Sequence, residues 1–199
     1  MKFIGITGGV GAGKSEILKY LSSREDTRVM LADDIARQLC EPGQPCNEKL
    51  QQIFSGNQVF DAEGNMDRVR MAAVIFADDE KRLQMNEIVH PAVKAYVLEQ
   101  YRLCKEQAGL QYLFLEAALL IEEHYDEICD ELWYIYTSEE NRRKRLMASR
   151  GYSNEKIDEI FASQLCEEEY RSHCLRIIDN NGTTEETISQ VKEILLSNG

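Results

Sequence analysis

The chain has 199 residues, and its 23 basic and 35 acidic side chains give it a net charge of −12. Hydrophobic residues make up 43% of the sequence, which is enough for a core and excludes global disorder. The acidity excludes a general DNA-binding or membrane-surface protein, because both need a broad basic surface. We therefore expect one domain with small inserted subdomains, and positive charge gathered locally wherever an anion binds.

No secretory signal or membrane-spanning segment is predicted, so a soluble cytoplasmic protein is expected. The first apolar run is short, and the longest apolar stretch, residues 112–121, contains Glu116 and is too short to cross a bilayer. The six cysteines show no C-x-x-C spacing, so scattered reduced thiols are expected. Cys166, His173 and Cys174 form the one close group of Cys and His, which leaves metal binding there as an alternative.

Five short apolar runs predict β-strands, and longer segments with helical spacing separate them. Each run is almost continuously apolar, as in parallel strands that are buried on both faces. The expected strands are residues 2–7, 28–32, 112–115, 132–137 and 174–179. This alternation predicts an α/β fold with three layers, in which helices cover both faces of a roughly five-stranded parallel sheet.

The spacing of the expected strands is uneven, which predicts two helical insertions. The gap after the second strand is too long for one crossover helix, so residues 33–109 should form a helical subdomain with turns at 41–43 and 61–65. In this subdomain, Pro91 is expected in the first turn of a helix. Residues 138–173 should form a second, lid-like excursion. The core is then formed by residues 1–32, 110–137 and 174–199.

The strongest motif lies between the first expected strand and a helical segment. It reads Gly8-Gly9-Val10-Gly11-Ala12-Gly13-Lys14-Ser15 and fits the phosphate-loop pattern G-x-x-x-x-G-K-[ST]. Glycines let backbone N–H groups approach phosphate oxygens, and the positive end of the following helix faces the same anion. All eight residues are candidate ATP ligands, with Lys14 on the β- and γ-phosphates and Ser15 on Mg²⁺. The alternative is a glycine-rich turn with an incidental Lys-Ser pair.

A phosphate loop alone does not separate kinases from GTPases and motors. The chain lacks the guanine signature N-K-x-D and is short for a motor, which leaves a kinase of a small acceptor. Asp33 and Asp34 follow the second expected strand, at the sheet edge where ligands bind. Asp33 is the candidate base for the acceptor hydroxyl, and capping of a helix at 35–39 is the alternative role. Glu116, which ends the third strand, is a candidate for the water shell of the metal or an ordinary strand-end residue.

Positive charge is concentrated in residues 141–150, which contain five basic side chains and no acidic one. Arg142 and Arg145 are three positions apart and share a face of the expected helix. From a lid they can close over the transferred phosphoryl group and stabilise its charge. Arg143 and Lys144 are expected to face solvent, and an ordinary solvated basic face is the alternative for the whole segment.

Motifs along nearly the whole chain make it similar to the dephospho-CoA kinase family. Besides the phosphate loop, the matching segments are Ala32-Asp33-Asp34-Ile35-Ala36-Arg37-Gln38, Glu41-Pro42-Gly43, Met66-Asp67-Arg68, Ile75-Phe76, His90-Pro91, Leu119-Leu120-Ile121-Glu122, Gln164 and Ile178-Asp179-Asn180-Asn181-Gly182. The resemblance implies phosphorylation of the ribose 3′-hydroxyl of dephospho-CoA by ATP, the last step of coenzyme A synthesis.

The resemblance also implies roles for individual residues. Asp33 falls on the family's catalytic aspartate, and Arg145 falls on its catalytic lid arginine. For His90, a buried histidine before a proline is the alternative. The residues assigned to the acceptor are Asp33, Arg68, His90 and Glu116, and those assigned near the nucleotide base are Asn180 and Gly182.

The sequence departs from the family pattern at several positions. Leu31 and Glu116 stand where the family usually has aspartate, Glu16 replaces a threonine, and the second lid arginine falls on Ser149, with Arg150 beside it. We expect a monomer or weak homo-oligomer that uses dephospho-CoA, ATP and Mg²⁺, with no nucleic-acid or membrane partner. The alternatives are another P-loop nucleoside, nucleotide or small-molecule kinase, and a nucleotide-binding switch without catalysis.

Overall fold

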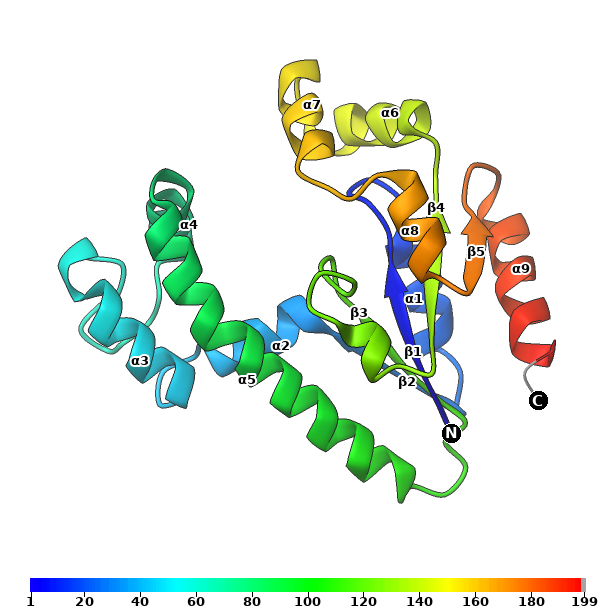
Figure 1. Ribbon diagram of the computed structural model, residues 1–199, viewed down its shortest axis with the longest axis horizontal. Coiled ribbons are helices and arrows are strands. Elements are labelled where there is room, and N and C mark those ends of the chain that lie inside the picture. Colours follow the sequence, from blue (N-terminus) through cyan, green and yellow to red (C-terminus); the bar gives the residue numbers. More distant parts are fainter. Residues whose placement is uncertain (198–199) are drawn as a thin grey trace. The chain divides into compact units, whose positions relative to one another are not determined.

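The computed structural model describes residues 1–197, which form two compact units (Figure 1). The first unit combines Met1–Val29 with the chain from Gln107 onward. The second unit is the continuous segment Met30–Glu106, which overlaps the helical insertion expected at residues 33–109.

The first unit is built on a five-stranded parallel sheet, so the fold predicted from the apolar runs is confirmed. The strand order is β2-β3-β1-β4-β5, with β1 in the middle. Ile6 lies beside Glu116 of β3, and Thr7 lies beside Tyr134 of β4. The residues that follow β1 and β3 therefore meet at one edge of the sheet. The strands are β1 Lys2–Thr7, β2 Thr27–Leu31, β3 Tyr112–Glu116, β4 Glu131–Tyr136 and β5 Arg176–Asp179.

The helices of the first unit follow the phosphate loop, the fourth strand and the fifth strand. They are α1 Lys14–Ser22, α6 Glu139–Arg150, α7 Asn154–Ala162, α8 Glu167–His173 and α9 Thr184–Ser197, with a short 3₁₀ turn, η2, at Tyr125–Glu127. Ser138 caps α6, because its hydroxyl accepts a hydrogen bond from the Asn141 N–H at 3.3 Å. This cap fixes where the basic helix begins relative to the end of β4.

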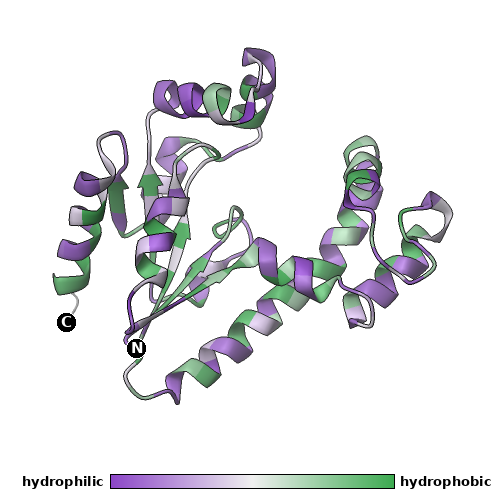
Figure 2. Ribbon diagram, turned by 180° about the vertical axis from the view of Figure 1, so that it is seen from behind, coloured by the Kyte–Doolittle hydropathy of each residue, from purple (hydrophilic) through white to green (hydrophobic). Residues whose placement is uncertain are grey.

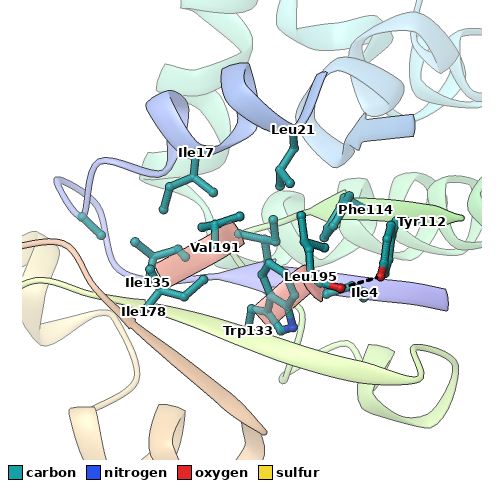
Figure 3. Close-up of a cluster of buried hydrophobic side chains, with 12 residues drawn as sticks. Ile4, Ile17, Leu21, Tyr112, Phe114, Trp133, Ile135, Ile178, Val191 and Leu195 are labelled. Carbon is teal, nitrogen blue, oxygen red and sulfur yellow. Dashed lines mark hydrogen bonds between the residues drawn. The ribbon is translucent and has the colours of Figure 1, made fainter. Parts of the chain in front are cut away.

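A cluster of buried apolar side chains joins the sheet to α1 and α9 (Figure 3). Ile17 and Leu21 of α1 are spaced for one helix face, and both are completely buried. Val191 and Leu195 of α9 meet the same cluster, as does the fully buried Trp133 of β4. Burying each such side chain stabilises the fold by about 1.5–3 kcal/mol. The core therefore holds α1, the helix that starts in the phosphate loop, firmly on the sheet.

The second unit is mainly helical. Asp67 caps the helix α4 (Arg68–Ala77), and Asp78 caps the helix α5 (Asp79–Lys105). Each aspartate accepts hydrogen bonds from two backbone N–H groups in the first turn of its helix. Turns occur where they were predicted, at residues 41–43 and 61–65, with the Gln44 N–H donating to the Glu41 carbonyl and the Gly64 N–H donating to the Asp61 carbonyl. The elements are α2 Ala32–Leu39, α3 Pro45–Phe54, η1 Ser55–Asn57, α4 Arg68–Ala77 and α5 Asp79–Lys105.

The long helix α5 continues through Pro91, so the expectation that this proline lies in a first turn is wrong. Proline removes one backbone hydrogen bond and normally kinks or ends a helix. Here Val89 and Val93, on either side of the proline, are both buried in the core of the unit. Their burial on one helix face outweighs the lost hydrogen bond.

Hydrophilic and hydrophobic residues alternate along the length of α5 (Figure 2). Within residues 1–197, no helix is both long enough and apolar enough to cross a membrane. No disulfide bond joins any of the six cysteines, all of which lie within residues 1–197.

Candidate active site

The phosphate loop leaves β1 after Thr7 and enters α1 at Lys14. Gly13, the residue before the helix, has a φ of 83°, a backbone conformation that residues other than glycine rarely adopt. A Cβ on Gly13 would also lie 2.5 Å from the Asn180 side-chain nitrogen. A Cβ on Gly9 would collide with the guanidinium of Arg142. The glycines thus let two distant side chains approach the loop backbone.

Lys14 spans the loop at the carboxyl edge of the sheet. Its Nζ donates a hydrogen bond to the Gly8 carbonyl at 2.6 Å and lies 3.5 Å from Oε1 of Glu116. Both charged side chains are mostly buried, with relative exposures of 15% and 18%. Glu116, at the end of β3, is therefore part of the charge arrangement around the loop.

Arg142 and Arg145 both point at the loop, as their spacing on the helix predicted. The Nε of Arg142 donates to the Val10 carbonyl at 2.9 Å. Nη1 of Arg145 donates to the Ala12 carbonyl at 3.1 Å, and its Nη2 donates to the Asn180 carbonyl at 2.7 Å. One face of α6 therefore lies over the phosphate loop.

The charges of these two arginines are not neutralised by the protein. Within residues 1–197, neither the Arg142 nor the Arg145 guanidinium forms an ion pair with a carboxylate. Burial lowers the pKa of Arg142, since desolvation disfavours the charged form. Two partly buried cations whose hydrogen bonds go to neutral oxygens are suited to an anion that completes their hydrogen bonding.

The opposite face of α6 carries ordinary surface ion pairs. Lys144 pairs with Glu140 at 2.6 Å, and its side chain is 68% exposed, as expected. Arg143 differs from the expectation, because it is only 26% exposed and binds Asp158 of α7 at 2.6 Å. It also pairs with Glu139 of its own helix, so it joins α6 to α7 instead of facing solvent.

Asn180 follows β5 and ties the C-terminal part of the chain to the loop. Its Nδ2 donates to the Ala12 carbonyl at 2.7 Å, and its Oδ1 accepts from the Thr187 hydroxyl at 2.8 Å. The Thr137 hydroxyl donates to the same Ala12 carbonyl at 2.9 Å. The side chain of Asn180 is thus used inside the protein, while Gly182 lies two positions further on, against Glu186.

Gln164 also contacts the loop, a role that was not assigned to it from the sequence. Its Oε1 accepts hydrogen bonds from the Val10 N–H at 3.3 Å and from Nη2 of Arg142. The sequence matched Gln164 to a family motif but assigned it no role. Thr137 and Thr187 were likewise missed, because spacing cannot reveal a contact between residues so far apart in the chain.

The second unit contains a cavity of about 570 Å³, and Asp33 and Arg68 both line it. Asp33 lies in the first turn of α2, whose N-cap residue is Leu31 and whose cap makes no side-chain hydrogen bond. The capping alternative for the aspartates is therefore wrong, and Asp34 pairs instead with Arg37 at 2.6 Å. The other lining side chains include Cys40, Met66, Met71, Met85 and Val89.

His90 is not among the residues that line this cavity, although its neighbour Val89 is. Burial raises the pKa of the Cys40 thiol, which lines the cavity, to about 11. In the part of the chain that the structure describes, no group of three His, Cys, Asp or Glu residues could hold a metal ion. The alternative of a metal site at Cys166, His173 and Cys174 is therefore wrong.

Comparison with known proteins agrees with this geometry. A family model described as dephospho-CoA kinase matches residues 2–186. The chain is 36% identical over 192 residues to a dephospho-CoA kinase from Shouchella clausii, covering 96% of each chain. It is 34% identical over 195 residues to one from Geobacter sulfurreducens, covering 98% of this chain and 97% of that protein.

Solved structures give the same result. A dephospho-CoA kinase from Campylobacter jejuni superposes with a TM-score of 0.73 at 25% identity, covering 99% of this chain and 98% of that one. A shikimate kinase from Acinetobacter baumannii, at 16% identity and a TM-score of 0.53, covers 100% of this chain and 94% of that one, and supports the P-loop kinase fold alone. The family match spans the phosphate loop, the helical second unit and the basic helix together, and this chain belongs to the dephospho-CoA kinase family.

Proposed function

We propose that the chain transfers the γ-phosphoryl group of ATP to the ribose 3′-hydroxyl of dephospho-CoA, giving coenzyme A and ADP. One observation carries the proposal: in a member of this family, a complete phosphate loop is faced by two arginines that have no carboxylate partner. Uncompensated cations beside a phosphate loop can bind and stabilise a transferring phosphoryl group.

In this proposal the first unit binds ATP. The backbone of residues 8–13 cradles the phosphates, with Lys14 and Arg142 on the phosphate oxygens. Arg145 stabilises the charge that spreads over the phosphoryl group during transfer. Asn180 and Gly182 are assigned near the base, and Asn180 also holds the Ala12 carbonyl.

The residues near Lys14 also suit Mg²⁺, which prefers oxygen ligands and retains some of its water. Ser15 follows Lys14 in the first turn of α1 and supplies a hydroxyl. Glu116, 3.5 Å from the Lys14 ammonium, supplies a carboxylate that can accept hydrogen bonds from metal-bound water. When bound with ATP, Mg²⁺ neutralises part of the phosphate charge.

The cavity of the second unit is proposed to bind the acceptor. Arg68 offers positive charge for the pyrophosphate of dephospho-CoA, and the methionines offer flexible apolar surface for its uncharged arm. Asp33 lines the same cavity, and we assign it the role of taking the proton of the attacking hydroxyl. His90 is assigned to the acceptor on its family motif alone, and Glu116 on its place at the end of β3.

The same proposal covers the setting in which the enzyme works. We assign it a cytoplasmic location and small-molecule substrates, with no nucleic-acid or membrane partner. We assign it a monomeric or weakly self-associating state.

The test is steady-state ADP release with ATP and Mg²⁺, measured with and without dephospho-CoA. Acceptor-dependent release, with coenzyme A as the product, supports the proposal. A panel of nucleosides, nucleoside monophosphates and shikimate provides the control acceptors. Faster release with one of these would show a different small-molecule kinase, and ATP binding without any acceptor-dependent release would show a nucleotide-binding switch.

A further inference from the structure

Gln164 joins the end of α7 to the phosphate loop through a single oxygen atom. It lies one residue beyond Ser163, the C-cap of α7. Its Oε1 accepts a hydrogen bond from the Val10 N–H at 3.3 Å and another from Nη2 of Arg142. The side chain therefore reaches from the lid region to the backbone of the loop and to the arginine above it.

The Arg142 guanidinium is held on several sides at once. Its Nε donates to the Val10 carbonyl at 2.9 Å, so the N–H and C=O of Val10 are bound by Gln164 and Arg142 respectively. The guanidinium carbon lies 4.2 Å from the centroid of the Phe161 ring, a cation–π contact. On the loop side the guanidinium lies against Gly9, where a Cβ would collide with it. Gln164 and Phe161, both near the end of α7, thus fix its orientation.

The Gln164 carboxamide is uncharged, and this matters because the arginine beside it is suited to binding an anion. A carboxylate in its place would bind the same guanidinium but would neutralise it, as carboxylates do for Arg143 on the other face of the helix. An amide oxygen orders a flexible arginine side chain and leaves its positive charge available to a ligand. Gln164 therefore meets the requirements of a residue that places a cation without cancelling it.

We propose that Gln164 is a positioning residue for nucleotide binding: its carboxamide oxygen holds the Arg142 guanidinium over Gly9 and Val10, where it meets the triphosphate of ATP. The inference rests on the proposed function only for its ligand, a nucleoside triphosphate. It does not depend on which acceptor receives the phosphoryl group.

The first test measures binding of Mg²⁺-ATP by calorimetry for the intact protein and three variants. Gln164→Ala is expected to weaken ATP binding about five- to tenfold, the value of one ordinary hydrogen bond, because Val10 and Phe161 still hold the guanidinium. Gln164→Glu, which keeps the acceptor oxygen, is expected to weaken it more, because the new carboxylate neutralises Arg142. Ser163→Ala is the matched control and should bind ATP like the parent. ATP affinity unchanged in both Gln164 variants would overturn the proposal.

The second test asks whether Gln164 acts through Arg142. Gln164→Ala is introduced into Arg142→Ala, with thermal unfolding checked for each protein. We expect no further loss of ATP affinity in the double variant, since the residue to be positioned is gone. If the two substitutions instead reduce ATP affinity by independent factors that multiply in the double variant, Gln164 has a general structural role and the proposal is overturned. In the kinase assay, Gln164→Ala should raise the KM for ATP and change kcat less than twofold. Failure of dephospho-CoA to act as acceptor would affect the proposed function but not these binding results.

Discussion

The phosphate-loop site of the first unit and the cavity of the second unit differ in one respect. The residues that form the loop site lie much further apart in the sequence than those that form the cavity. Around the loop, Asn180 binds Ala12 across 168 sequence positions, and Arg142 binds Val10 across 132. Among residues 1–197, those that line the cavity all lie between Asp33 and Val89. The proposed phosphoryl-transfer site therefore depends on contacts across the whole first unit, whereas the proposed acceptor cavity belongs to one continuous segment of the chain.

The two sites also use positive charge differently. At the loop, Arg142 and Arg145 donate to neutral oxygens, and within residues 1–197 neither pairs with a carboxylate. In the cavity, Arg37 is neutralised by Asp34, while Arg68 forms no ion pair among the described residues. A triphosphate needs several cations, but an acceptor with one pyrophosphate needs fewer. This difference predicts that substitutions in the two units affect separate kinetic constants.

The largest effect is expected from Asp33→Asn in the cavity. Loss of a general base should lower kcat about a hundred- to ten-thousandfold, because the amide cannot accept the hydroxyl proton. ATP affinity should stay unchanged, since the residues proposed to bind ATP lie in the other unit. Turnover with dephospho-CoA and calorimetric ATP binding test both parts. Unchanged turnover would remove Asp33 from the mechanism.

A matched pair on α6 tests the two faces of one helix. Arg145→Ala should lower kcat about a hundred- to thousandfold, by removing a cation from the transferring phosphoryl group. Lys144→Ala, one residue away, removes only an exposed ion pair and should change neither kcat nor the melting temperature measurably. Steady-state kinetics with both purified variants provides the comparison. An equal loss of kcat in the two variants would show that activity depends on the total positive charge of α6 and not on which face of the helix carries it.

Whether a feature of each site was predictable from the sequence depends on how far apart in the chain its contacting residues lie. The loop motif and the shared face of Arg142 and Arg145 are local patterns, so both were predictable. The roles of Gln164 and Thr187 depend on side chains that meet only after folding, and no spacing reveals them. The path of α5 through Pro91 was missed for the same reason, since the burial that favours it is tertiary.

A smaller effect is expected from Arg68→Ala at the cavity. Removing a charge-assisted hydrogen bond to the acceptor should raise the KM for dephospho-CoA about ten- to a hundredfold, with the KM for ATP unchanged. Arg70→Ala is the control, because Arg70 lies on the same helix but pairs with Asp67 and does not line the cavity. If both variants raise the KM for ATP instead, the proposal that the first unit binds ATP and the second binds the acceptor is incorrect.

The smallest effect concerns Cys40, whose thiol reports on occupancy of the cavity. The thiolate is the reactive form, and burial raises the pKa of Cys40 to about 11. Alkylation by iodoacetamide should therefore be slow at neutral pH. It should accelerate about tenfold per pH unit up to pH 10 in the folded chain, whereas in the unfolded chain the rate levels off near about pH 8.5.

Dephospho-CoA at about four times its Kd should slow alkylation of Cys40 about fivefold, by reducing the fraction of empty cavities. ATP should not slow it. Cys166, exposed and in the other unit, serves as an internal control whose rate the acceptor should leave unchanged. The rates are measured by mass spectrometry of peptides from the same sample. Protection of Cys40 by ATP, or equal rates with and without dephospho-CoA, would place the acceptor elsewhere than in this cavity.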